Sequence, residues 1–327
     1  MTGAASTGTG RGTMRDLAKL YNDFYGLTER PFSLLPDPDF LYWAAPHSKA
    51  YTMLEYGIAT HAPITMITGE IGSGKTTLVR KLLDDIPMDY SIGLVSNAQG
   101  GRGELLHWVL MSLGQKAEPG ASYVDLFRRF QEFLIEEYAA GRRTALIFDE
   151  AQNLTPDALE ELRMFSNINA DKDELLQLIL IGQPELRDLV RRPELTQFAQ
   201  RIAAEFHLRA LAAEETDSYI LHRLRHAGAA EDLFTPEARR MIHNAARGVP
   251  RLINQLCDYA LVYGFAEERR DIDADTVREV LSDRRQYGVF SDPDSPAPAP
   301  DAGSAPPAAE AATDEDNVFH GVWDRKA

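Results

Sequence analysis

The stretch GEIGSGKTT, which begins at Gly69, has the residue types and spacing needed to hold a phosphate chain, because it fits the pattern G-x-x-x-x-G-K-[ST]. Glycines let such a loop turn its amides inward as an anion-binding nest, and a helix beginning at Gly74 would add its positive dipole end. Lys75 then places a cation on the β- and γ-phosphates, and the Thr76 hydroxyl is the expected Mg²⁺ ligand. The predicted nucleotide-binding residues of this loop are Gly69, Glu70, Ile71, Gly72, Ser73, Gly74, Lys75, Thr76 and Thr77.

A pair of carboxylates follows a second apolar run, since TALIFDE ends in Asp149 and Glu150. A carboxylate at the C-terminal end of a strand adjacent to the loop would hold Mg²⁺ through water, which is the role predicted for Asp149. Glu150 can orient and polarise the water that attacks the γ-phosphate. A single solvated acid at a strand end is common, but two acids after four apolar residues, downstream of a phosphate loop, indicate nucleotide hydrolysis.

Two amide side chains are further candidates for contact with the γ-phosphate. Gln183 ends the run LILIGQ and would lie at the carboxyl edge of the sheet, between the two nucleotide motifs. There its amide can hydrogen-bond the γ-phosphate or the water, although a glutamine before a proline often only ends a strand. Asn97 ends GLVSN and could sense the γ-phosphate by restraining Glu150.

Strand-like and helix-like segments alternate along the part of the chain that carries these motifs. Strands are expected at 63–68, 91–97, 144–150 and 176–183, with a weaker one at 204–211. This alternation predicts an α/β, three-layer P-loop fold in which helices cover a parallel sheet. After residue 211 no strand signal remains, and four helices are expected, at 214–228, 235–248, 249–268 and 273–285.

Composition divides the chain into four parts. Residues 1–16 are rich in Gly, Ser and Thr and are expected to be disordered. Residues 17–210 carry the nucleotide motifs, and residues 211–287 are expected to form an α-helical lid. Residues 288–327 are rich in Pro, Ala and acids, so they lack the apolar surface that would offset the entropy of ordering. The cluster that contains Phe319 and Trp323 near the end is either a frayed terminus or a tethered docking peptide.

The bulk composition is that of a cytoplasmic globular protein. A single cysteine, Cys257, lies in an apolar helical run, which excludes an internal disulfide framework and predicts a buried structural thiol. No stretch approaches the ~20 apolar residues of a membrane span, and the N-terminus lacks the apolar core of a signal peptide. The net charge of −16 disfavours a broad electrostatic grip on nucleic acid, while a local basic patch remains open.

Taken together, the motifs resemble those of the AAA+ ATPases, and within them the ExeA/GspA-like ATPases of general secretion pathway component A. The resemblance extends over about 21–281, and its motifs are FYGLTERPFSLLPDPDFLY, GEIGSGKTT, LIFDEAQNL, LILIGQPEL, AQRIAAEFHLRAL and GVPRLINQLCDYAL. The same layout occurs in TniB-like transposition ATPases and in ATPases encoded beside exosortase and exopolysaccharide systems. The resemblance implies an AAA+ core with ATP and Mg²⁺ as cofactors.

The resemblance also implies roles for residues outside the two nucleotide motifs. Arg201, in AQRI, matches the family's arginine finger, which would reach the γ-phosphate of a neighbouring subunit; Arg191 and Arg192 are competitors for this role. Arg251, in GVPR, matches the lid arginine that lies over the nucleotide. The stretch Pro36–Tyr42 would line the adenine pocket or serve as a proline-rich strap on the core.

The leading hypothesis is an oligomeric ATPase, with a hexameric ring as one form, that energises or assembles an envelope export machinery. A full general secretion pathway component A continues into a membrane span and a peptidoglycan-binding domain, whereas this sequence does not. The resemblance therefore favours a partner of a polysaccharide or exosortase-type system, reached through the C-terminal tail and located peripherally at the inner membrane. The alternative is a DNA-associated AAA+ regulator of transposition, which the acidic charge disfavours.

Overall fold

The computed structural model describes residues 21–96, 104–116, 120–170 and 173–287, and the side chains at 169, 170, 173, 174 and 287 are not described. The expected segments at 1–16 and 288–327, with Phe319 and Trp323, lie outside this part of the chain, as does Asn97. The chain divides into two units between Asp283 and Arg284. The side-chain contacts described below all lie in the first unit.

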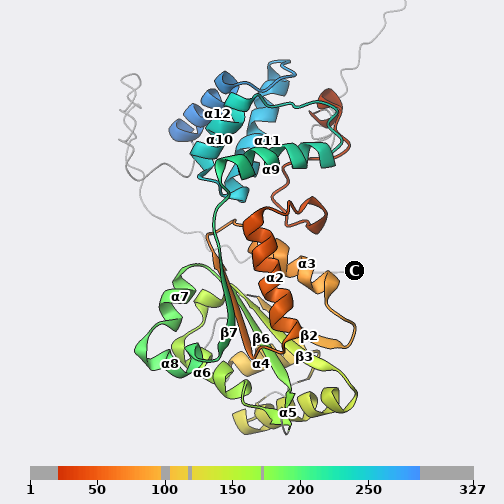
Figure 1. The fold of residues 1–327 in the computed structure, drawn as a ribbon, viewed down its shortest axis with the longest axis vertical. Coiled ribbons are helices and arrows are strands. Elements are labelled where there is room, and N and C mark those ends of the chain that lie inside the picture. The colour runs from red at the N-terminus through yellow and green to blue at the C-terminus, as the bar shows by residue number, and fades with distance from the viewer. Residues whose placement is uncertain (1–20, 97–103, 117–119, 171–172, 288–327) are drawn as a thin grey trace, which may run out of the picture. The chain divides into compact units, whose positions relative to one another are not determined.

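The five predicted strands form one parallel sheet, as the α/β prediction required (Figure 1). Their bounds are β1 (Ile64–Gly69), β2 (Tyr90–Ser96), β3 (Arg143–Asp149), β6 (Leu176–Gly182) and β7 (Ile202–Leu208), in the order β2-β3-β6-β1-β7. The phosphate loop follows β1, and β6 separates β1 from β3. The strand that ends in the carboxylate pair is therefore not the direct neighbour of the loop. A two-residue antiparallel pair, β4 (Asn169–Ala170) and β5 (Asp173–Glu174), was not predicted.

The sheet is covered on both faces, which explains why its central strands β1, β3 and β6 are nearly continuous buried runs rather than alternating ones. The helices of this layer are α2 (Ala45–Ala59), α3 (Lys75–Asp85), α4 (Glu104–Ser112), α5 (Tyr123–Ala139), α6 (Pro156–Phe165), α7 (Glu185–Val190) and α8 (Thr196–Ala199). One apolar cluster joins α2 and α3 to one face of the sheet. A second cluster joins the five helices α4, α5, α6, α7 and α8 to the opposite face. The three-layer prediction is thereby confirmed.

The four predicted C-terminal helices are present as α9 (Ala213–His226), α10 (Pro236–Ala246), α11 (Pro250–Ala266) and α12 (Ala274–Tyr287). Side-chain caps begin two of them, since Thr235 accepts the amide of Ala238 and Asp273 accepts that of Thr276. Cys257 on α11 is fully buried, and burial raises its pKa, so it is the structural thiol that was predicted. Among the described helices, none is long and apolar enough to cross a membrane.

The N-terminal segment Tyr21–Ala44 packs into the core of the C-terminal helices, which the sequence did not predict. Its buried aromatic and aliphatic side chains share one cluster with α9, α10, α11 and α12. The Tyr25 hydroxyl donates to the carbonyl oxygen of Leu261 at 3.0 Å, and the Phe32 and Phe234 rings meet edge to face. A helical layer built from both ends of the described chain therefore stands beside the carboxyl edge of the sheet.

Candidate nucleotide site

The phosphate loop has the backbone that its glycines predict. Gly72 and Gly74 have φ of 77° and 101°, in the left-handed region that side chains disfavour, and Gly74 caps the N-terminus of α3. Space is also lacking, because a Cβ on Gly74 would lie 2.9 Å from His47 Nε2. At Gly72 a Cβ would lie 2.4 Å from the Cβ of Arg251. The loop thus needs glycine for conformation and for close contact with two neighbouring elements.

Lys75 lies inside this loop. Its Nζ donates to the carbonyl oxygens of Gly69 at 2.7 Å and Glu70 at 2.9 Å. Burial lowers the pKa of Lys75, while the charges of Glu150 and Asp149 act in the opposite direction. The ammonium group thus sits among carbonyl oxygens and carboxylates, where a phosphate chain could take over part of its coordination.

Asp149 and Thr76 meet although they are 73 residues apart. The Thr76 hydroxyl donates to Asp149 Oδ2 at 3.3 Å, and Asp149 Oδ1 accepts the Glu150 amide at 3.0 Å. Burial raises the pKa of Asp149, which means that a cation at the carboxylate would relieve an unfavourable buried charge. A hydroxyl and a carboxylate oxygen at this spacing fit the oxygen ligands that Mg²⁺ prefers.

Glu150 is held by two amide side chains. Its own backbone has φ of 56°, and its Oε2 accepts hydrogen bonds from Gln152 Nε2 at 2.5 Å and Gln183 Nε2 at 3.1 Å. Gln152 Oε1 in turn accepts a hydrogen bond from the backbone N–H of Gln183 at 2.9 Å. Burial acts to raise the pKa of Glu150, but the bonds from Gln152 and Gln183 and the charge of Lys75 outweigh it, so the pKa is lowered.

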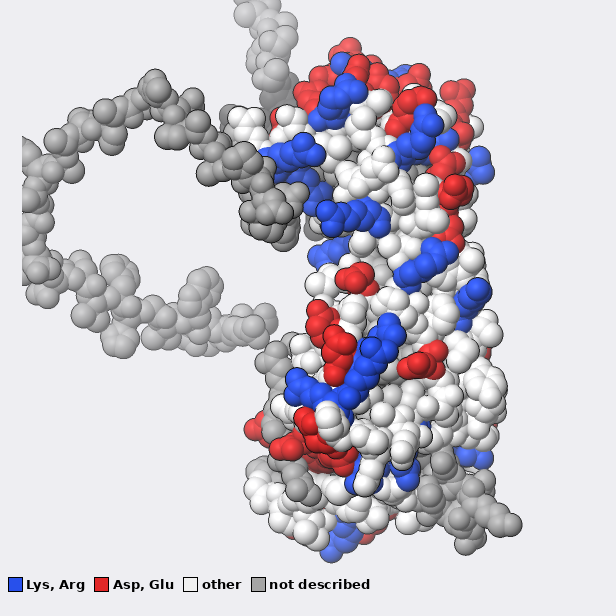
Figure 2. All heavy atoms as spheres, turned by 60° about the vertical axis from the view of Figure 1, so that its left-hand side comes forward, with Lys and Arg blue, Asp and Glu red and all other residues white. Residues whose placement is uncertain are grey.

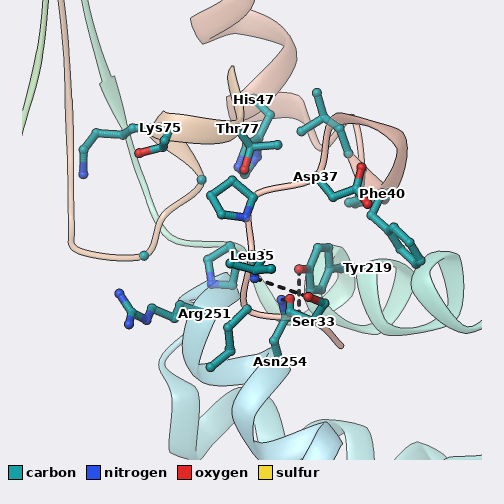
Figure 3. Close-up of a pocket in the computed structure, with 18 of the residues that line it drawn as sticks. Ser33, Leu35, Asp37, Phe40, His47, Lys75, Thr77, Tyr219, Arg251 and Asn254 are labelled. Carbon is teal, nitrogen blue, oxygen red and sulfur yellow. Dashed lines mark hydrogen bonds between the residues drawn. The ribbon is translucent and has the colours of Figure 1, made fainter. Parts of the chain in front are cut away.

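A cavity of about 200 Å³ lies between the loop, the segment 33–42 and the C-terminal helices (Figure 3). Lys75 and Arg251 lie at one end of the view, and Phe40 and Tyr219 at the other. The predicted site residues that line the cavity are Ile71, Gly72, Gly74, Lys75, Thr76, Thr77, Glu150 and Arg251. Gly69, Glu70, Ser73, Asp149, Gln183 and Arg201 are not part of its lining. The stretch Pro36–Tyr42 runs along the cavity, apart from Pro38 and Asp39.

The structure gives the predicted arginines different positions. The Arg251 amide, at the start of α11, donates to the Gly72 carbonyl oxygen at 3.1 Å, and its side chain is exposed. Arg201 lies away from the cavity of its own chain. Its guanidinium donates to the carbonyl and hydroxyl oxygens of Ser166, both at 3.0 Å, and to Asn167 Oδ1. Arg191 and Arg192 are exposed.

Several residues of the site were not found by sequence reasoning. His47 is 5% exposed, and its Nε2 lies 2.9 Å from the Ser73 carbonyl oxygen. Gln152 was overlooked, although its place two residues after Glu150 was a usable signal. The helical layer adds Tyr219, Arg223 and Asn254, which line the cavity. Their contacts join segments roughly 200 residues apart, so local patterns give no sign of them.

Charged side chains of both signs are interspersed on the face of the molecule drawn in Figure 2. Both signs occur there over the described residues. Among the described side chains of the molecule, several form short ion pairs, such as Arg163–Glu160 and Arg209–Glu215. Paired charges contribute little net field at a distance. This face therefore does not present the continuous basic surface that duplex DNA would require.

Residues 58–190 match the model of a family described as AAA domain. The chain is 40% identical over 247 residues, 76% of its length, to General secretion pathway protein A of Aeromonas hydrophila, but spans only 45% of that relative. A structure of Drosophila ORC bound to DNA has a TM-score of 0.61 at 12% identity. The match covers 86% of this chain and 70% of the matched ORC chain. The structure of the Aeropyrum pernix ORC2 protein in ADPNP–ADP complexes has a TM-score of 0.54 at 18% identity. The match covers 72% of this chain and 66% of the ORC2 chain.

Proposed function

Because the chain belongs to the AAA+ P-loop ATPases and is related to general secretion pathway protein A, we propose that it hydrolyses ATP with Mg²⁺ to assemble or energise an envelope export machinery. The observation that carries the ATPase proposal is the position of the Glu150 carboxylate. It lines the same cavity as Lys75 and Thr76, and two glutamines hold it there in its ionised form.

Each step of hydrolysis has a group in this chain that can perform it. The loop amides and Lys75 bind the phosphates. Thr76 with Asp149 would hold Mg²⁺, whose charge would offset that of the phosphate oxygens. Glu150 orients and polarises the attacking water. Arg201, supplied by a neighbouring copy, stabilises charge on the transferred phosphoryl group, and Arg251 lies over the nucleotide from the helical layer.

The ATPase proposal is tested by turnover of ATP by the purified chain. Wild type should release phosphate in a Mg²⁺-dependent reaction. Lys75→Ala should not bind ATP, since the loop loses its cation. Glu150→Gln keeps the shape of the site but loses the polarising carboxylate, so it should bind ATP and hydrolyse it at least about 10²-fold more slowly. Wild-type turnover by Glu150→Gln would refute the assignment of the base.

The export role rests on the relatedness to general secretion pathway protein A, of which this chain spans less than half. We therefore propose a cytoplasmic homo-oligomer, located at the inner membrane through its partners, that serves a secretion or polysaccharide export system. In the organism that encodes the chain, deleting the gene should reduce export, and a wild-type copy should restore it while a Glu150→Gln copy should not. Unchanged export after deletion would contradict this role.

Regulation of transposition on DNA is a competing process for the same ATPase. The interspersed charges of Figure 2 and the net charge of −16 both weigh against it. Retention on a DNA column is the deciding measurement, because non-specific binding through phosphates should persist at moderate salt if DNA is the partner. Elution of the protein at low salt supports the export role.

A further inference from the structure

A buried arginine with an unused donor lines the cavity at the end opposite the phosphate loop. Arg223, on α9, is 6% exposed, and its Nη2 is buried without a hydrogen-bond partner among the described residues. None of the carboxylates in this part of the chain pairs with it. An unmade hydrogen bond at a buried charged group costs free energy, so an arginine in this state is suited to a ligand that brings an acceptor.

Two other nitrogens of Arg223 make hydrogen bonds, which fixes the direction of the guanidinium. Its Nε donates to the Pro31 carbonyl oxygen, and its Nη1 donates to the Tyr219 hydroxyl at 3.1 Å. The guanidinium carbon lies 4.6 Å from the centre of the Phe40 ring, a cation–π contact that helps to offset the loss of water. Nη2 is the guanidinium nitrogen that has no hydrogen-bond partner among the described residues.

A chain of hydrogen bonds ties this arginine to the cavity wall. The Tyr219 hydroxyl donates to Asn254 Oδ1 at 2.8 Å, and Asn254 Nδ2 donates to the Ser33 carbonyl oxygen at 3.2 Å (Figure 3). The network therefore spans α9, α11 and the segment that begins at Pro31. Groups that are held from several sides in this way lose little entropy when a ligand binds.

On these grounds we infer that Arg223 contacts the nucleobase, and that its Nη2 donates a hydrogen bond to a ring nitrogen of the base. The inference rests on the proposed binding of ATP. Lys75 and Arg251 occupy the end of the cavity that would take the phosphates, so the base points toward Phe40 and Tyr219. Arginine is a donor at every nitrogen, so it can pair only with acceptors, which in adenine are N1, N3 and N7.

The test removes these acceptors one at a time and needs no mutation. Dissociation constants are measured for wild type with ATP, 1-deaza-ATP, 3-deaza-ATP and 7-deaza-ATP, and with inorganic tripolyphosphate as a ligand without a base. A charged donor that loses its acceptor weakens binding by at least about ten-fold, so one of the three analogues should bind that much more weakly than ATP. Equal affinity for ATP and all three analogues would overturn the inference.

A variant then assigns the contact to Arg223. Arg223→Lys keeps the charge but removes Nη2, so ATP should bind about ten-fold more weakly, the sensitive analogue should no longer differ from ATP, and tripolyphosphate should bind as in wild type. A parallel loss of ATP and tripolyphosphate would mean that Arg223 is structural and would refute the contact. Arg225→Lys is the matched control, because Arg225 is exposed on the same helix and lies 3.7 Å from Asp232.

The same measurements separate this inference from the proposed function. If wild type binds neither ATP nor tripolyphosphate, the nucleotide site itself is refuted, and the base contact is refuted with it. If wild type binds both ligands but does not distinguish the analogues, the ATPase proposal stands and only the role of Arg223 is lost.

Discussion

His47 Nε2 lies 2.9 Å from the carbonyl oxygen of Ser73, so a buried histidine of α2 holds the turn of the phosphate loop. A carbonyl only accepts, which means that Nε2 carries the proton and Nδ1 does not. Nδ1 is buried without a hydrogen-bond partner among the described atoms, and burial lowers the pKa of His47. The neutral imidazole therefore acts as a donor that fixes the loop before any nucleotide arrives.

His47→Asn should weaken ATP binding several-fold, because the shorter amide cannot reach the Ser73 carbonyl and the loop loses its anchor. His47→Gln places an amide donor near the position of Nε2 and should bind ATP much as wild type does. Titration with ATP measures both, and denaturant unfolding should show a loss of about 1–3 kcal/mol for the Asn variant alone. Equal behaviour of the two variants would contradict the donor role.

The stability of the protein should also depend on pH through His47. Its pKa is lowered in the folded state by burial and by the charge of Arg209, although the bond to Ser73 and the charge of Glu215 oppose this. As the pH falls below about 6.5, His47 therefore takes up a proton in the unfolded chain before it does so in the folded protein. The free energy of unfolding decreases over this range. Urea unfolding from pH 7.5 to 5 should therefore show a steeper decrease for wild type than for His47→Gln. Parallel curves would argue against a neutral buried imidazole.

Gly72→Ala should destabilise the contact between the phosphate loop and α11. The new Cβ would lie 2.4 Å from the Cβ of Arg251, and the left-handed backbone adds about 1–2 kcal/mol for any side chain. Gly26→Ala is the matched control, because Gly26 has a similar φ of 69° with nothing within 4 Å of its Cβ. In thermal unfolding, the Tm of Gly72→Ala should be well below that of Gly26→Ala. An equal decrease of Tm in both variants would show that the α11 contact is unimportant.

Gln183→Ala should lower the turnover number while leaving ATP affinity near wild type. Its amide donates to Glu150 Oε2, and this bond helps to keep the pKa of Glu150 low. Without it the carboxylate takes up a proton at a higher pH, so the acidic limb of the pH–rate profile should move upward. A profile that keeps its position would indicate that Gln152 alone is sufficient to hold Glu150.

Arg201→Ala should reduce turnover by roughly 10³–10⁵-fold if the residue acts on a neighbouring subunit, the range of arginine fingers in phosphoryl transfer. The guanidinium must first leave Ser166 and Asn167, which hold it in its own chain. Mixing Arg201→Ala with Lys75→Ala subunits should restore part of the activity, since each supplies what the other lacks. Arg192→Ala tests the competing candidate, and it should keep wild-type turnover if Arg201 is the finger. Full activity of a protein that stays monomeric at all concentrations would contradict the prediction.

The sequence by itself determined the elements whose causes are local. The apolar runs of β1, β3 and β6 predict buried parallel strands, and the spacing from Gly69 to Thr76 predicts the phosphate loop, because both depend on residues next to one another in the chain. Likewise, Thr235 and Asp273 mark helix starts through bonds to amides three residues away.

Only the tertiary structure decided which of these elements meet. The insertion of β6 between β1 and β3 agrees with the place predicted for Gln183, but the hydrogen bond from Gln183 to Glu150 could not be predicted from any periodicity in the sequence. His47 reaches Ser73, and Arg223 reaches Pro31, through the packing of helices on distant segments. Such contacts follow from which apolar faces bury one another across the whole chain. The end of the cavity at Phe40 and Tyr219 is therefore a product of long-range packing, while the phosphate loop at the other end follows from one short motif.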